Sequence, residues 1–228
     1  MYLVYNGFMN EDLVQIVKCY ATRPHAEFSS LLLGKSKDNL ISVFTDLLTN
    51  YINDKNSSSL REFVTVSIAG YKHNPNKLGY NGFKHDSGIS GTPIACEAKP
   101  KNIRSVDYDL KKTKPKFNGE GGFNDYTPER LKKDKKVNLN LLSSGFLDGE
   151  LVYILEFPFS AISKRLQEQL PKVRKVGEYK RVANFNFSHY TKIKALKVIY
   201  LNKGTLLKSE KYFNRTFFKF LKSKKDIR

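Results

Sequence analysis

The segment Leu-Val-Tyr-Ile-Leu-Glu-Phe at residues 151–157 restricts the possible folds of this chain more than any other segment. It has the length of a β-strand, and its nearly continuous apolar character is typical of a strand that is buried on both faces. A sheet with such a strand in its interior needs cover on both sides. The sequence therefore predicts an α/β fold in which helices flank a central mixed sheet.

The remaining chain contains the helices and strands that such a fold needs. An apolar stripe with Leu40, Phe44 and Leu47 predicts a helix, Thr127 and Pro128 are typical of a helix start, and the alternation of Val64, Val66 and Ile68 predicts a strand. We expect helices over residues 13–20, 36–52, 127–145, 160–170 and 206–221, and strands over residues 61–71, 83–86, 92–99, 151–157, 182–187 and 193–201.

Length and composition indicate a single globular domain over residues 1–228. Hydrophobic residues make up 40% of the chain and aromatic residues 13%, which is a folded composition. The sequence contains no apolar run long enough for a membrane span and no signal peptide, so we expect a cytoplasmic protein without membrane contact. Cys19 and Cys96 lack metal-ligand spacing and are expected to be reduced, which argues against zinc.

The net charge of +18 indicates a polyanionic partner, most simply nucleic acid. The charge is unevenly distributed, because residues 1–70 hold 6 Lys or Arg against 7 Asp or Glu, whereas residues 171–228 hold 17 against 3. We therefore expect a basic C-terminal extension of strands and helix, at about residues 171–228, that contacts DNA. Charge alone would equally fit ribosome binding or a membrane surface.

A candidate catalytic motif lies at the end of the segment 92–99. The period of two in a strand puts the side chains of Glu97 and Lys99 on one face. If Asp86 lies on the neighbouring strand, two carboxylates and one ammonium meet at a sheet edge, as metal-assisted phosphodiester hydrolysis requires. The alternative is that the strand ends before Pro100 and that Glu97 and Lys99 flank this end in solvent. The short motif alone does not exclude this alternative.

The order of the expected helices and strands supports the catalytic interpretation of this motif. A helix, a strand, a strand ending at Asp86, a strand ending in Glu97-x-Lys99, a helix and a strand follow one another over about residues 38–157. In this order and motif the sequence resembles the PD-(D/E)xK nucleases, and among them the type II restriction endonucleases. The resemblance implies a restriction-endonuclease-like core. His85 stands where the family motif has its proline.

The resemblance also implies the roles of the site residues. Asp86, Glu97 and the carbonyl oxygen of Ala98 would bind Mg²⁺, and Lys99 would orient the attacking water. The reaction would be the hydrolysis of double-stranded DNA at a specific sequence, leaving 5′-phosphate and 3′-hydroxyl ends, with no organic cofactor. A palindromic target would favour a homodimer.

Basic and amide side chains outside the motif are candidates for DNA contact, because Asn pairs with adenine, Arg or Lys with guanine and Asp with cytosine. The segment 101–126 is expected to be a long functional loop. The candidates are His85, Lys101, Asn102, Arg104, Lys114, Lys116, Asn124, Asp125, Lys172, Arg174, Lys175, Lys180 and Arg181.

Two other functions stay open at the level of sequence. A repair or junction-resolving nuclease of the same fold would cut branched or damaged DNA. A non-catalytic nucleic-acid-binding protein would carry the Glu97-x-Lys99 pattern by coincidence and would bind without metal-dependent hydrolysis.

Overall fold

The computed structural model describes residues 11–53, 58–74, 79–85, 93–108, 114–170 and 178–227. Its helices are α1 (Glu11–Thr22), α2 (His25–Leu33), α3 (Lys37–Asn53), α4 (Ser58–Ile68), α5 (Ser105–Tyr108), α6 (Pro128–Val137), α7 (Ser160–Gln169), α8 (Lys203–Lys208) and α9 (Arg215–Lys222). Its strands are β1 (Lys72–His73), β2 (Gly82–Lys84), β3 (Ile94–Ile103), β4 (Gly121–Tyr126), β5 (Asn140–Leu147), β6 (Glu150–Pro158), β7 (Lys180–Phe185) and β8 (Lys197–Leu201).

The described strands form a six-stranded mixed sheet and a separate two-stranded ribbon. The order in the sheet is β1-β2-β3-β5-β6-β8, in which β3 and β5 are parallel and the other neighbours are antiparallel. Strands β4 and β7 pair antiparallel as the ribbon. The predicted mixed sheet flanked by helices is thereby confirmed.

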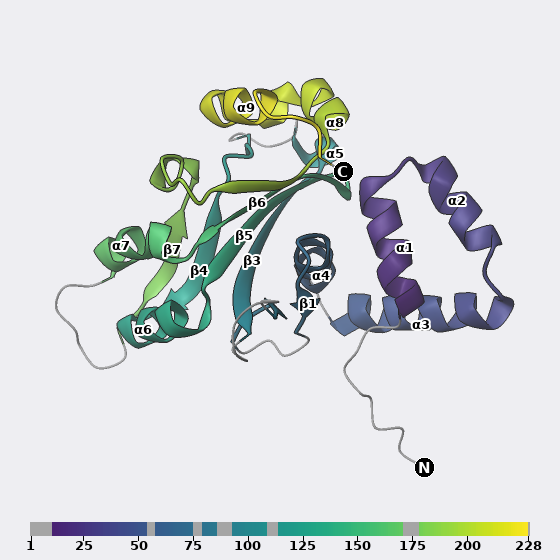
Figure 1. The fold of residues 1–228 in the computed structure, drawn as a ribbon, viewed down its shortest axis with the longest axis horizontal. Helices are drawn as coiled ribbons and strands as arrows, with labels where there is room; N and C mark the ends of the chain where they lie inside the picture. Colours follow the sequence, from purple (N-terminus) through teal and green to yellow (C-terminus); the bar gives the residue numbers. More distant parts are fainter. Residues whose placement is uncertain are drawn as a thin grey trace, which may run out of the picture.

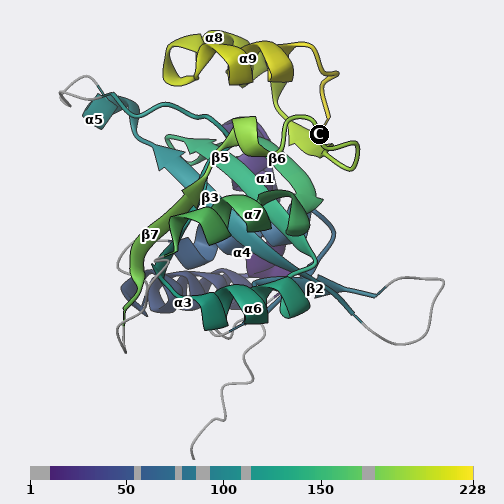
Figure 2. The same cartoon turned by 90° about the vertical axis from the view of Figure 1, so that its left-hand side faces the viewer.

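Helices cover both faces of the sheet (Figures 1 and 2). On one face, Phe63 and Val66 of α4 pack against Cys96 and Ala98 of β3. On the other face, α6, α7, the ribbon and the C-terminal helices bury a larger, aromatic-rich core. Strand β6 is covered on both faces, and residues 151–157 are all buried, as their apolar sequence predicts.

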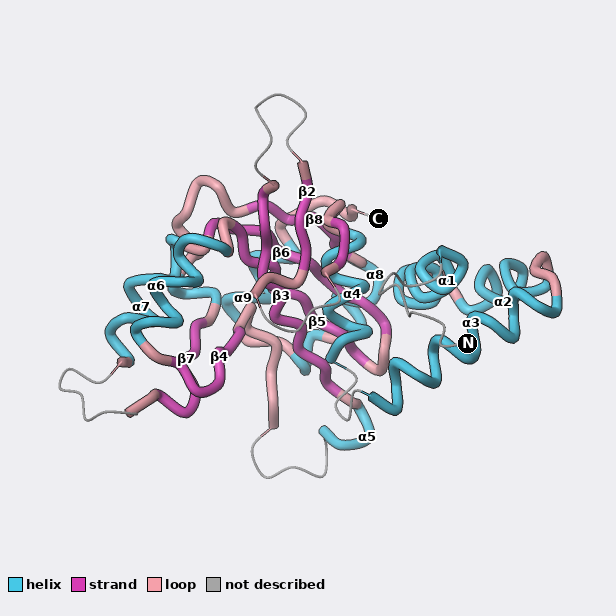
Figure 3. The backbone as a smooth tube through the Cα atoms, turned by 90° about the horizontal axis from the view of Figure 1, so that it is seen from below, coloured by secondary structure: helices cyan, strands magenta, loops and turns pink. Residues whose placement is uncertain are grey.

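Helices α1, α2 and α3 form an arm beside the sheet (Figure 3). Leu13, Ile16 and Val43 make a small core of their own in this arm. Helix α2 was not predicted, because Pro24 was read as the end of the preceding helix. Pro24 instead stands directly before the first residue of α2, and proline is tolerated at the start of a helix. Among the described residues, no helix is long and apolar enough to cross a membrane.

The strand predicted over residues 61–71 is wrong, because this segment forms helix α4. Phe63, Val64, Thr65 and Val66 are consecutive and all buried. They are buried because α4 lies between the sheet and α1, which it contacts as well. Burial on several sides removes the helical periodicity from the sequence, and the β-branched residues then imitate a strand.

The helix predicted over residues 127–145 is correct only in its first part. Thr127 caps α6 by accepting a hydrogen bond from the Arg130 amide, as expected, but α6 ends at Val137. Residues 140–147 form β5, a central strand whose residues 141–146 are all buried. Gly145, which was expected to end the helix, lies within this strand. A glycine is needed there because Tyr153 of β6 occupies the space that a side chain would need.

Strand β3 continues through Pro100, which was expected to bound it. The amide of Ala98 faces β2, and the period of two directs the Pro100 nitrogen to the same side. Strand β2 pairs with β3 only as far as Gly82 opposite Cys96. Proline is therefore tolerated, because its missing N–H faces a side that β2 has already left.

Two further expectations are corrected. The predicted loop 101–126 contains the end of β3, helix α5 and strand β4, while residues 109–113 lie outside the described residues. The helix predicted over 206–221 is divided into α8 and α9, because the Asn214 side chain accepts hydrogen bonds from the amides of Thr216 and Phe217 and caps a new helix.

Candidate active site

Glu97 and Lys99 lie side by side on β3, as the period of two predicts. Lys99 Nζ is 2.6 Å from Glu97 Oε1, and the two side chains are only 18% and 11% exposed. This pair is therefore a defined feature of the fold and not two charges at a strand end in solvent.

Strand β2 separates from β3 beside this pair. Asn81 is the last residue to bond β3, with its backbone N–H on the carbonyl of Cys96 at 2.9 Å. Its side chain takes the next position, where Oδ1 accepts a hydrogen bond from the Ala98 amide at 2.8 Å. The Ala98 carbonyl points toward the same edge, because the N–H and C=O of one strand residue face the same neighbour.

Glu62 of α4 reaches this edge from the other face of the sheet. Asn81 Nδ2 donates a 3.0 Å hydrogen bond to Glu62 Oε2. Asn81 thus links Glu62 of α4 to the backbone of β3 at Ala98, the residue between Glu97 and Lys99. Sequence analysis missed Glu62 and Asn81, because Glu62 was assigned to a strand and the turn-rich sequence around Asn81 contains no catalytic motif.

The ribbon covers the pair on the side opposite to α4. Lys99 Nζ lies 4.3 Å from the centroid of the Phe123 ring, a cation–π contact. Gly121 permits this close approach, since a Cβ on it would stand 2.8 Å from Lys99 Cβ. The face of β3 that carries Glu97 and Lys99 is therefore covered by β4 at Lys99.

A second buried carboxylate, Asp134 of α6, lies on the ribbon side. Burial raises the pKa of Asp134, and the negative charge of Glu97 acts in the same direction. Tyr126 Oη donates to Asp134 Oδ2 at 3.0 Å, and Asn138 Nδ2 donates to Oδ1 at 3.4 Å. Because protein donors engage both of its oxygens, Asp134 is a structural acid and a poor candidate for a metal ligand.

The predicted ligand Asp86 lies outside the described residues, as do Lys172, Arg174 and Lys175. The chain can be followed along β2 to Lys84, opposite Ile94, and on to the exposed His85. His85 contacts Phe83 edge to face. Together with Lys84 and Glu156 it lines a cavity of about 400 Å³.

Of the candidate DNA contacts near β3, Lys101 and Lys114 make contacts within the protein. Lys101 donates to the carbonyl of Lys116 at 2.8 Å and pairs with Glu120. Burial lowers the pKa of Lys101 to about 8. Asn102 is half-buried, and Lys114 Nζ lies 5.3 Å from the ring centroid of Tyr108. Arg104 is exposed.

Four other candidates come together on the ribbon. Asn124 of β4 is the partner of Val182 of β7, and Tyr126 is the partner of Lys180. Asn124, Asp125, Lys180 and Arg181 are all exposed. Residues that were selected from two separate parts of the sequence therefore lie on one ribbon.

The edge at Asn81 has a suitable donor set for Mg²⁺. Carboxylate and carbonyl oxygens are the ligands that Mg²⁺ prefers, and here they come from Glu62, Glu97 and Ala98. No cluster of three or more His, Cys, Asp or Glu side chains is placed to hold a metal within the described ranges, from which Asp86 is missing.

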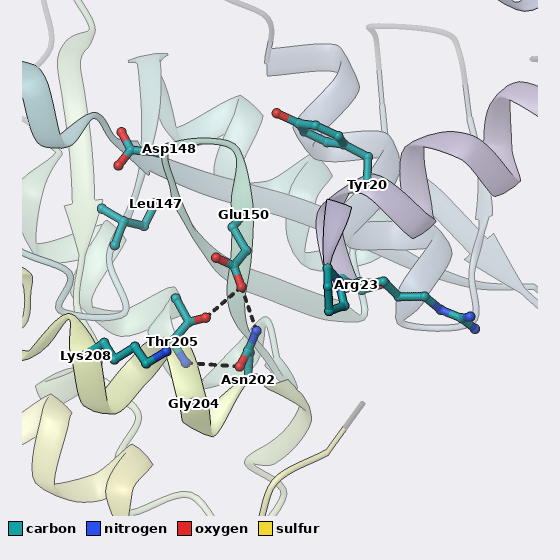
Figure 4. A pocket seen from close by; sticks show the side chains of 11 residues that line it. Tyr20, Arg23, Leu147, Asp148, Glu150, Asn202, Gly204, Thr205 and Lys208 are labelled. Carbon is teal, nitrogen blue, oxygen red and sulfur yellow. Dashed lines mark hydrogen bonds between the residues drawn. The ribbon is translucent and has the colours of Figure 1, made fainter. Parts of the chain in front are cut away.

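A separate cavity of about 540 Å³ lies between α1, the turn after β5 and α8 (Figure 4). Its acid Glu150 accepts hydrogen bonds from Asn202 Nδ2 at 2.8 Å and from Thr205 Oγ1 at 2.6 Å. These contacts join β6 to the C-terminal helices. We assign this cavity no chemical role, because its polar groups serve the packing of the fold.

Comparison of the chain with models of protein families and with curated proteins finds no match.

Proposed function

We propose that this protein is a Mg²⁺-dependent endonuclease that hydrolyses double-stranded DNA at a specific sequence. One observation carries the proposal: where β2 leaves β3, the Glu97–Lys99 pair flanks Ala98, whose amide binds Asn81, and Asn81 in turn binds Glu62 at 3.0 Å. Acidic and carbonyl oxygens beside a lysine are the groups that metal-assisted phosphodiester hydrolysis uses.

The topology around this edge supports a restriction-endonuclease-like core. Helix α4 is followed by strands β1, β2 and β3, and after α5 and β4 come helix α6 and strand β5, which is parallel to β3. The order differs from the expected one, because residues 61–68 form a helix and residues 140–147 a strand.

Each residue of the site has a distinct role in the proposed reaction. Glu97, the Ala98 carbonyl and Glu62 would hold Mg²⁺, together with Asp86. The bound ion would act as a Lewis acid on the scissile phosphate and lower the pKa of the attacking water. Lys99 would orient that water and stabilise the negative charge that develops on the phosphate oxygens. Asn81 would position Glu62 through its side-chain hydrogen bond.

The charge of the protein supports a DNA substrate. A net charge of +18 favours a polyanion. Helix α6, which carries exposed lysines, is joined to β4 of the ribbon by the hydrogen bonds of Arg130 and Asp134. If the target is palindromic, the active form would be a homodimer whose two-fold axis matches that of the DNA.

The deciding experiment is the incubation of the full chain with long unmethylated duplex DNA, in Mg²⁺ or in EDTA, followed by sequencing of the fragment ends. We expect discrete fragments that appear only with Mg²⁺ and share a terminal sequence. Glu97→Gln and Lys99→Ala should each slow cleavage at least about 100-fold and leave DNA binding intact. Glu120→Gln, a nearby carboxylate outside the site, is the matched control and should cleave within a few-fold of wild type.

Three outcomes would redirect or reject this proposal. Cleavage of branched DNA alone would indicate a junction-resolving or repair nuclease. Binding without any Mg²⁺-dependent cleavage would indicate a non-catalytic DNA-binding protein. Full activity of Lys99→Ala would reject the assignment of the site.

A further inference from the structure

The ribbon of β4 and β7 has two different faces. Phe123, Ala183 and Phe185 point into the aromatic-rich core and are buried. Asn124, Val182 and Asn184 are exposed, and the apolar side chain of Val182 is 41% accessible to solvent. The exposed face thus presents two amides and one branched apolar side chain.

The ribbon is held rigidly through its backbone. Gln169 of α7 donates from Nε2 to the Asn184 carbonyl at 2.8 Å and accepts at Oε1 from the Asn184 amide at 3.0 Å. Arg130 Nη1 donates to the Asn124 carbonyl at 2.8 Å. On the ribbon, these bonds involve only the backbone groups of Asn124 and Asn184. Within the described part of the chain, the side-chain amides of Asn124 and Asn184 have no hydrogen-bond partner.

Gly122 is the register partner of Asn184. With no side chain on Gly122, a ligand can approach this part of the ribbon closely. Lys180 and Arg181 are exposed at the other end of β7, and α6 adds four exposed lysines, Lys132, Lys133, Lys135 and Lys136. A face of neutral side chains that can form hydrogen bonds, bordered by these cations and by the exposed Asp125, is complementary to a DNA groove between its phosphate strands.

The ribbon also lies next to the candidate active site. The ring of Phe123, which points inward from β4, has its centroid 4.3 Å from Lys99 Nζ. Asn124 follows Phe123 directly and faces outward. A duplex held on the outer face would therefore be bound by the same strand that covers the proposed catalytic lysine.

We propose that the ribbon enters the major groove of duplex DNA and reads A·T base pairs. The inference rests on the DNA substrate of the proposed function and adds the element and the bases that provide specificity. The major groove admits a two-stranded β-ribbon, an Asn amide pairs with two atoms of adenine, and an apolar side chain contacts the thymine methyl group. Asn124 and Asn184 read adenine, Val182 contacts a thymine methyl, and Lys180 and Arg181 bind phosphates.

Strand geometry also gives the spacing of the contacts. Val182 and Asn184 are two residues apart, or roughly 6.6 Å along a strand. Two base steps along one DNA strand span about 6.8 Å. When β7 lies along the groove, Val182 and Asn184 therefore face bases that are two positions apart.

The test is a binding selection from a random-sequence duplex DNA library, performed in EDTA so that no cleavage occurs. We expect wild type to enrich a motif with A·T pairs two positions apart. Asn184→Ala, Asn124→Ala and Val182→Ala should each relax the preference at one position by about 5- to 150-fold. Each should keep the affinity of wild type for unselected DNA.

Two controls separate base reading from general binding. Asn39→Ala removes an exposed amide of the α3 arm and should leave the motif unchanged. Lys180→Ala should weaken binding to all sequences alike and reduce the slope of log affinity against log salt by about 0.9. A double-stranded RNA of matched length should bind without the motif, because its major groove does not admit a ribbon.

The outcomes distinguish this inference from the proposed function. An enriched motif that the three ribbon variants relax, in a protein that does not cleave DNA, supports the ribbon and rejects the nuclease. Mg²⁺-dependent cleavage by a protein that enriches no motif overturns the ribbon and leaves the nuclease. A motif that survives all three substitutions also overturns it, and so does binding to double-stranded RNA as tight as to the selected DNA.

Discussion

Asn81 donates a 3.0 Å hydrogen bond to Glu62 and so links helix α4 to the edge of the sheet where Glu97 and Lys99 lie. The same side chain accepts from the Ala98 amide and completes the bonding of β3 after β2 has turned away. A single neutral amide thereby holds a carboxylate beside the proposed Mg²⁺ ligands. Replacing this amide with a third carboxylate tests whether the edge binds a divalent cation.

We expect Asn81→Asp to make the stability of the protein depend on Mg²⁺. In EDTA the new carboxylate repels Glu62 and loses its hydrogen bond, which should lower the free energy of unfolding by about 1–3 kcal/mol. Mg²⁺ bound between the carboxylates should reverse the loss. Thermal unfolding with increasing Mg²⁺ measures the effect, with Asn81→Ala as a control that lacks the new carboxylate and should gain less stability from Mg²⁺. Equal responses of Asn81→Asp and Asn81→Ala to Mg²⁺ would contradict a cation next to residue 81.

Two adjacent glycines of β4 should differ in their tolerance of alanine. A Cβ on Gly121 would stand 2.5 Å from the Phe185 ring, whereas on Gly122 the nearest atom would be Val182 Cγ1 at 3.3 Å. We expect Gly121→Ala to reduce the free energy of unfolding by about 1–3 kcal/mol through overpacking. Gly122→Ala should change it by less than about 0.5 kcal/mol. Urea denaturation measures both, and equal values would show that β4 is not pressed against β3.

His73 should make the protein sensitive to acid. Burial against Phe63 lowers the pKa of His73 from 6.5 to about 4. As the pH falls through this window, the unfolded chain binds a proton that the folded chain does not, so stability decreases. The decrease is at most about 3 kcal/mol. Denaturation between pH 7 and 4 should show it in wild type and not in His73→Phe, and parallel curves for the two proteins would exclude this cause.

The buried Glu156 should matter more than the surface lysine that it contacts. Tyr71 donates to Glu156 Oε2 at 2.7 Å, and Lys84 Nζ lies 3.4 Å from the same atom. Lys197 Nζ lies 3.6 Å from Oε1 but is 65% exposed. We expect Glu156→Ala to lower the free energy of unfolding by about 1–3 kcal/mol and Lys197→Ala to lower it by less than about 1 kcal/mol. Chemical denaturation provides the comparison, and the reverse order would be inconsistent with this geometry.

Local chemistry was sufficient to predict several features of the fold. The strand at 151–157, the start of α6 at Thr127 and Pro128, and the shared face of Glu97 and Lys99 all follow from interactions between near neighbours in the chain. The boundaries failed where burial on several sides removed the periodicity, as in α4 and β5.

The remaining features depend on contacts between segments that the sequence does not relate. Asn81 and Glu62 are brought together by the packing of α4 on the sheet, and Asn124 and Val182 by the pairing of β4 with β7. Strand registers and helix docking are set by the fit of whole surfaces. The sequence by itself determined the Glu97–Lys99 pair on β3 and the basic charge, because these are local or additive properties. Only the tertiary structure decided which helix carboxylate binds Asn81 beside that pair and which exposed residues lie together on the ribbon, because these depend on packing between distant segments.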